Sequence, residues 1–156
     1  MKNHKIIVSV VVLICIMLGL VCYFIFSQRT IGTDSGYSYS IKSALNGSDM
    51  WTISTPKITK ITLSKSTKSN LSYEFELQQY KQSVDEMIEL EKKLKKERCF
   101  LSNTEIGKVA KSTSEEAMEI LGTRYSYSVY LICKEISRLE ENCEQIMMSL
   151  GGSITK

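Results

Sequence analysis

The stretch Val129–Leu150, VYLICKEISRLEENCEQIMMSL, decides the fold of this chain. Its apolar side chains recur every three or four residues, which places them along one side of a helix. Charged residues such as Glu135, Arg138 and Glu141 lie largely off that side, and Gly151 follows the last apolar position. The spacing predicts a long amphipathic helix over 128–150. Its apolar stripe consists of Val129, Ile132, Cys133, Ile136, Leu139, Cys143, Ile146, Met147 and Leu150.

Three further helices are predicted upstream of this stretch. A similar stripe predicts a helix over 80–98, and Ser83–Glu86 matches the S-x-x-E capping box at its start. The same signature at Ser102–Glu105 and Thr113–Glu116 predicts short helices over 105–111 and 115–121, the second ended by Gly122. The stripe over 80–98 contains Tyr80, Val84, Met87, Ile88, Glu91 and Leu94.

Strand patterns precede the helices. Residues 37–41, 50–54 and 58–64 are short runs of β-favouring residues, and Pro56 separates the last two. Residues 71–78 alternate between apolar and polar side chains, which predicts a β-hairpin over 57–79. We therefore expect an α+β fold, with a small antiparallel sheet packed by two to four helices. Trp51, Tyr73 and Phe75 are the candidate contacts for a partner or ligand.

The chain has five cysteines, three of which follow residue 90: Cys99, Cys133 and Cys143. Cys133 and Cys143 lie roughly 15 Å apart along one predicted helix, which is too far for a mutual disulfide. In an oxidising compartment a bridge would join Cys99 to Cys133 or to Cys143. The alternative is three buried free thiols.

Residues 6–26, IIVSVVVLICIMLGLVCYFIF, carry no charge. A helix of this length would cross the roughly 30 Å hydrocarbon core of a bilayer. We expect a transmembrane anchor, with residues 1–5 as a tail, 27–49 as a juxtamembrane spacer and 50–156 as an α+β domain. A cleaved signal peptide would have a shorter apolar run and a small-residue cleavage site, and Tyr23–Phe26 is bulky. A lipoprotein would need a small residue before its acylated Cys, whereas Cys15 follows Ile14 and Cys22 follows Val21.

The charges indicate how the anchor is oriented. Lys2 and Lys5 precede it, and basic residues favour the cytoplasmic side of a membrane. We therefore expect a single-pass inner-membrane protein with a cytoplasmic N-terminus and a periplasmic C-terminal domain. All 17 acidic residues follow the anchor, and the net charge of +3 resides in Lys2, Lys5 and Arg29 beside it. The neutral domain argues against a direct nucleic-acid interface.

Residues for catalysis are scarce. The only histidine is His4, in the predicted tail. A domain without histidine lacks the usual general base, the Ser–His and Cys–His nucleophile pairs, and most zinc sites. No glycine-rich phosphate loop follows a strand. We expect neither enzymatic activity nor a catalytic, cofactor or metal site.

The layout of the chain resembles that of small bacterial inner-membrane partners of membrane-bound, winged-helix virulence regulators, the ToxS-like and PsaF/MyfF-like proteins. The matching features are the short basic tail Met1–Lys5, the apolar run Ile6–Phe26 and the Trp-bearing segment Met50–Pro56. The resemblance implies a protein that binds, protects and regulates the periplasmic domain of a ToxR-like regulator. ToxS-like domains are mostly β, whereas residues 80–150 here are predicted to be mostly helical, so no site residues are carried over.

Two functions follow from these features. The first is a membrane-anchored partner that stabilises or regulates another single-pass membrane protein and senses a small apolar ligand or another environmental signal. The alternative is a structural component of an envelope assembly, such as a secretion apparatus, pilus or phage lysis complex, in which the two long helices would form a homo-oligomer.

Overall fold

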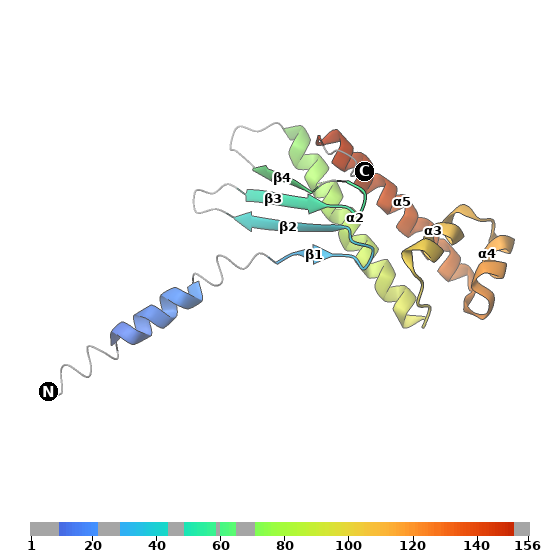
Figure 1. Cartoon of the computed structure of the whole chain (residues 1–156), viewed down its shortest axis with the longest axis horizontal. Helices are drawn as coiled ribbons and strands as arrows, with labels where there is room; N and C mark the ends of the chain where they lie inside the picture. Colours follow the sequence, from blue (N-terminus) through green and yellow to red (C-terminus); the bar gives the residue numbers. More distant parts are fainter. Residues whose placement is uncertain (1–9, 22–28, 44–48, 59, 65–70, 152–156) are drawn as a thin grey trace.

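The computed structural model describes residues 10–21, 29–43, 49–58, 60–64 and 71–151. These residues form an α+β fold in which a four-stranded antiparallel sheet precedes a set of helices (Figure 1), so the predicted fold class is confirmed. The elements after the helix at residues 10–21 are β1 Ile31–Gly32, β2 Ser38–Ser43, β3 Asp49–Ser54, β4 Ile61–Ser64, α2 Leu71–Lys96, α3 Asn103–Lys111, α4 Ser114–Leu121, the 3-10 turn η1 Gly122–Arg124 and α5 Tyr127–Ser149.

The sheet is a meander in the order β1-β2-β3-β4. Tyr39 lies opposite Ile53, and Ile41 lies opposite Trp51. Residues directly opposite each other in an antiparallel pair point to the same face, so these four side chains share one face. Ser38, Ser40, Thr52 and Ser54 alternate with them and lie on the opposite face.

Helices α2 and α5 pack against each other and cover the apolar face of the sheet (Figure 1). This packing forms a sheet cluster, and a second, helical cluster lies where the end of α2 and the start of α5 meet α3 and α4. The sheet cluster includes Tyr39, Trp51, Ile53, Tyr80, Val84, Met87, Leu139, Cys143 and Met147. The helical cluster includes Leu94, Cys99, Ile106, Val109, Ala117, Leu121, Val129, Cys133 and Ile136.

Helix α5 confirms the stripe predicted from the sequence, since every residue of that stripe is buried. The first half of the stripe enters the helical cluster and the second half enters the sheet cluster, so α5 joins the two. Ser126 caps the helix by accepting a hydrogen bond from the Val129 N–H at 3.1 Å. Gly151 follows with a φ of 91°, which a glycine adopts without strain.

Two of the three predicted capping boxes are confirmed. Ser102 caps α3 and Thr113 caps α4, each with a reciprocal Glu three residues on. The third prediction is wrong, because Ser83 lies inside α2, is buried, and accepts a hydrogen bond from the Asn142 side chain at 2.9 Å.

The predicted β-hairpin over 57–79 is wrong in its second half. Residues 71–79 form the first turns of α2, which begins at Leu71 rather than near residue 80. The residues that pack are Leu77, Tyr80 and Val84, spaced by three and four, so helical periodicity extends back to residue 77. Tyr73 and Phe75, which produced the alternation, are exposed. Glu, Leu and Gln favour a helix in this segment, and packing on the sheet selects that state.

The folded domain begins earlier than the predicted boundary at residue 50. Strands β1 and β2 lie within residues 27–49, the segment predicted as a spacer, and both belong to the sheet. Strand β2 provides Tyr39, a buried member of the sheet cluster. At least residues 31–43 are therefore part of the domain.

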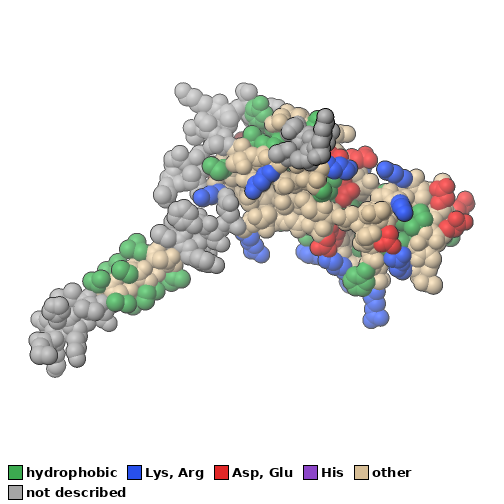
Figure 2. Space-filling view, viewed as in Figure 1, with side chains coloured by type: hydrophobic (Ala, Val, Ile, Leu, Met, Phe, Trp, Pro, Cys, Tyr) green, Lys and Arg blue, Asp and Glu red, His purple; other side chains and the backbone are tan. Residues whose placement is uncertain are grey.

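Residues 10–21 form a helix whose side chains are all exposed. Apolar side chains lie along its surface (Figure 2). Among the described residues, no helix is both long and apolar enough to cross a membrane. The predicted anchor over 6–26 includes residues 6–9 and 22–26, which lie outside the described part of the chain, so the transmembrane helix stays a prediction.

Candidate functional site

The turn between β1 and β2 connects the sheet to both long helices. Thr33 stabilises it, because its N–H donates to the Tyr37 carbonyl at 2.8 Å and its Oγ1 accepts from the Tyr37 N–H at 3.0 Å. Gly36 has a φ of 94°, which is strained for most other residues. The turn thereby presents Asp34, Ser35 and Tyr37 to the helices.

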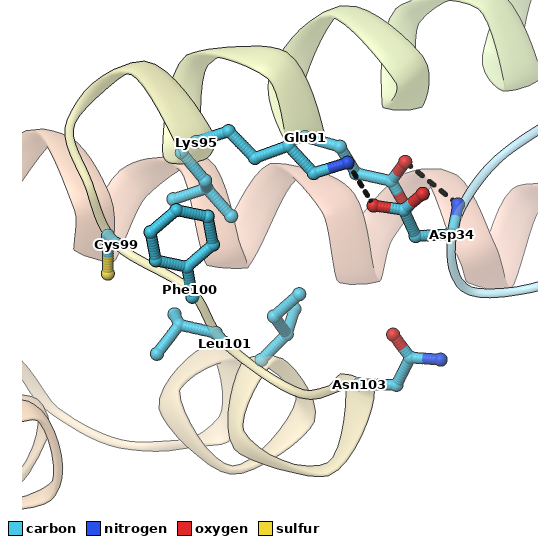
Figure 3. Close-up of a pocket in the computed structure, with 9 residues that line it drawn as sticks. Asp34, Glu91, Lys95, Cys99, Phe100, Leu101 and Asn103 are labelled. Atoms are coloured by element: carbon cyan, nitrogen blue, oxygen red, sulfur yellow. Dashed lines mark hydrogen bonds and ion pairs between the residues drawn. The ribbon is translucent and has the colours of Figure 1, made fainter.

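On the α2 side, Asp34 makes two contacts (Figure 3). Its backbone N–H donates to Glu91 Oε2 at 3.0 Å, and its Oδ2 lies 2.6 Å from Lys95 Nζ. Glu91 is only 9% exposed, which is unusual for a carboxylate. The backbone donor from the turn compensates part of the cost of burying it.

On the α5 side, Tyr37 makes the corresponding contact. Its hydroxyl donates to Glu144 Oε1 at 2.8 Å, and Lys57 Nζ lies 2.8 Å from the same oxygen. One five-residue turn is therefore bonded to carboxylates of both long helices, and Lys57 adds the loop after β3.

Beside this turn lies a pocket of about 150 Å³, formed by the end of α2, the loop after it and the start of α3. Figure 3 shows Asp34, Glu91 and Asn103 toward one end of the pocket and Cys99, Phe100 and Leu101 toward the other. Leu94, Lys95 and Ile106 complete the lining. The pocket thus has a polar end and an apolar end.

Burial has the largest effect on the acidity of Glu91. It raises the pKa of that carboxyl, as does the nearby Asp34 carboxylate, while backbone donors from Asp34 and Ser35 and the charge of Lys95 oppose the rise. Burial likewise raises the pKa of Glu140 on α5, against the opposing contacts of Ser35 and Lys57. Burial also raises the pKa of the Cys99 thiol.

We expect Glu91→Gln to stabilise the domain relative to the native chain at neutral pH, with an advantage that shrinks as the pH falls. The pKa of Glu91 is higher in the folded state than its ordinary value of 4.5. The contribution of this carboxyl to the stability of the native chain is therefore greatest below the unfolded pKa and is lost as the pH rises through the folded pKa. Glutamine cannot ionise, so it lacks this dependence. Urea unfolding of both proteins between pH 4.5 and 8 measures the difference, and a constant difference would contradict the assignment.

A second, more open cleft of about 310 Å³ lies next to the pocket and shares Asn103 with it. It is polar, and its carboxylates Glu140, Glu141 and Glu144 all come from α5. Glu144 is bonded to Tyr37 and Lys57, so this carboxylate of the cleft helps to fix the turn.

The three predicted contact residues do not form one surface. Trp51 is buried in the sheet cluster, with its ring centroid 6.4 Å from that of Tyr39. Tyr73 and Phe75 are exposed on α2. Residues two positions apart on a helix point to nearly opposite sides of it. Trp51 therefore has a packing role, and the shared face expected for Tyr73 and Phe75 on a strand does not exist.

The three cysteines of the domain are buried free thiols, which is the alternative to the expected bridge. Cys99 and Cys133 belong to the helical cluster, whereas Cys143 belongs to the sheet cluster. Cys99 also lines the pocket, and its Sγ lies 3.9 Å from the carbonyl oxygen of Arg124.

Sequence reasoning missed the pocket, although one signal was visible. Glu91 falls on the apolar stripe of its helix, where a carboxylate needs a specific partner. That partner, the Asp34 backbone, lies in a segment predicted as a spacer, so the pairing could not be identified from spacing alone.

Among the described residues, no group of three or more His, Cys, Asp or Glu side chains is arranged to hold a metal ion. Comparison of the chain with protein-family models, with curated proteins and with solved structures finds no match.

Proposed function

We propose that this chain is a membrane-anchored partner protein whose α+β domain stabilises or regulates another single-pass membrane protein. The observation that carries the proposal is the helix over residues 10–21. Its apolar side chains are exposed all around, with Leu13 at 66% and Leu18 at 58%. Exposed apolar surface costs about 25 cal/mol per Å² in water, so such a helix favours lipid or another apolar helix.

The organisation of the domain supports a role in binding. Its two core clusters are formed without the helix over 10–21, and the face in Figure 2 shows basic and acidic side chains on its surface. The anchor would restrict such a domain to the membrane surface, which raises its effective concentration near a partner of similar topology. The basic tail Met1–Lys5 favours an inner-membrane orientation with the domain in the periplasm.

The packing of the long helices makes the structural-assembly alternative less favourable. That function would use the apolar stripes of residues 80–98 and 128–150 for self-association. The stripes of α2 and α5 are instead buried against each other, the sheet and α3. An assembly would have to use other surfaces.

Membrane fractionation tests the anchor. We expect the full chain to stay in the membrane pellet after an alkaline wash, and its domain to be digested by protease only when the periplasmic side is accessible. The double variant Leu13→Arg and Met17→Arg should leave the pellet, because each arginine costs about 2.5–3.5 kcal/mol at the centre of an inserted helix. Two exposed residues of α5, Leu131→Arg and Met148→Arg, are the matched control and should remain in the pellet.

A second experiment tests the partner. Deleting the gene for this chain in its own cell should lower the steady-state level of one single-pass membrane protein, and that same protein should co-purify with the tagged chain. Recovery of the native chain in the soluble fraction would overturn the anchor. An unchanged membrane proteome after the deletion would overturn the partner role.

A further inference from the structure

The pocket of Figure 3 is small and partly open, with a polar end and an apolar end. Its volume of about 150 Å³ is similar to that of a cavity that holds benzene in another protein, so it suits a body of about one aromatic ring. Leu94, Leu101 and Ile106 give it apolar walls. At the other end, Glu91 is only 9% exposed, and the turn supplies its backbone donors, the Asp34 N–H at 3.0 Å and the Ser35 N–H.

The charges at the polar end favour a cation. Two carboxylates, Asp34 and Glu91, and one ammonium, Lys95, line the pocket, so its net charge is negative. Lys95 is paired with Asp34 at 2.6 Å and has an exposed side chain, which leaves Glu91 as the more buried anion. A carboxylate has about four lone-pair directions and can accept further donors beside the backbone.

We propose that this pocket binds small primary amines whose apolar body is about the size of one aromatic ring. The ammonium would donate to Glu91, and the Asn103 side-chain carbonyl lies at the same end as a second acceptor. The body would lie against Leu101 and Ile106. Phe100, which is 70% exposed at this pocket, would cover part of the ligand and lose contact with water.

The same arrangement rejects other small molecules of this size. A carboxylate head would face Glu91 in a site of low dielectric, where like charges repel strongly. A neutral alcohol can donate one hydrogen bond to Glu91 but brings no compensating charge. Among ligands with the same apolar group, the pocket should therefore bind the amine most tightly, the alcohol less tightly and the carboxylic acid least.

Benzylamine, benzyl alcohol and benzoate are the probes, titrated into the full chain in a mild detergent and followed by calorimetry at low salt. We expect benzylamine to bind with a Kd of about 1 mM, an affinity well inside the ceiling for a ligand of its size. It should bind about tenfold more tightly than benzyl alcohol, and benzoate should not bind measurably. Equal affinity for benzylamine and benzoate, or no binding of any probe at about 10 mM, roughly tenfold above the expected Kd, would overturn the proposal.

Three variants assign the binding to this pocket. Glu91→Gln should weaken benzylamine about tenfold, whereas Glu86→Gln, an exposed carboxylate of the same helix, should not change it. Leu101→Trp should fill the apolar end and abolish binding. Lys95→Gln should strengthen benzylamine binding by up to about fivefold, the scale of one exposed ion pair, because it frees Asp34.

The gain of affinity in Lys95→Gln cannot result from misfolding, so it keeps the test decisive if Leu101→Trp fails to fold. Equal effects of Glu91→Gln and Glu86→Gln, or weaker binding in Lys95→Gln, would place the amine elsewhere. The site is independent of the anchor proposed above: fractionation tests one and amine binding tests the other.

Discussion

Replacing Tyr80 with alanine is expected to lower the free energy of unfolding by about 3–5 kcal/mol, the range for removing a buried aromatic ring. Tyr80 has no exposed surface and joins α2 to the sheet, where its hydroxyl donates to the Ser54 carbonyl at 2.6 Å. Urea unfolding followed by circular dichroism measures the change.

Two further substitutions divide this effect into its parts. Tyr80→Phe removes only the hydroxyl and should cost about 1–2 kcal/mol, because the Ser54 carbonyl loses its donor. Tyr73→Ala, on the exposed first turns of α2, should cost less than about 0.5 kcal/mol, since alanine favours a helix. A large loss in Tyr73→Ala would instead support the strand predicted for this segment.

The second large effect concerns α3. We expect Val109→Asp to destabilise the helical cluster by about 3–5 kcal/mol, because Val109 has no exposed surface and the new carboxylate would be buried without a partner. Since the sheet cluster is formed by other residues, the loss should be local. Hydrogen exchange should show faster exchange in α3 and α4, with protection retained in β2 and β3.

The control for this experiment is Thr104→Asp, which introduces the same carboxylate at an exposed position in the first turn of α3. There the charge meets the positive end of the helix dipole, so the expected effect is neutral or slightly stabilising. Equal loss of protection in α3 and in β3 after Val109→Asp would show that the two clusters unfold as one unit.

The parts of this fold that could be predicted are those controlled by local patterns. The stripe of α5 extends over six turns, and the boxes at Ser102 and Thr113 each hydrogen-bond within four residues. The first turns of α2 could not be predicted, because the decision between strand and helix depends on where Leu77 and Tyr80 pack. The alternation of Tyr73 and Phe75 resembled a strand only because exposed aromatic residues happened to fall two apart.

The candidate site depended still more on distant contacts. Asp34 and Glu91 are separated by 57 positions in the sequence, and their contact exists only because β1 and α2 lie side by side. Glu144 meets Tyr37 across a still longer separation. Burial, which raises the pKa of both Glu91 and Glu140, likewise follows from packing and not from composition.

The early start of the sheet sets how far the domain could reach from a membrane. If residues 6–26 lie in lipid, only residues 27–30 precede β1, and such a tether spans at most about 14 Å when fully extended. The domain would then stay close to the bilayer surface, because a short linker does not let it sample a wide volume. A protein that engages it must present its own binding surface at that same height, and lengthening the tether with a flexible insert before Ile31 should weaken their association without altering the fold.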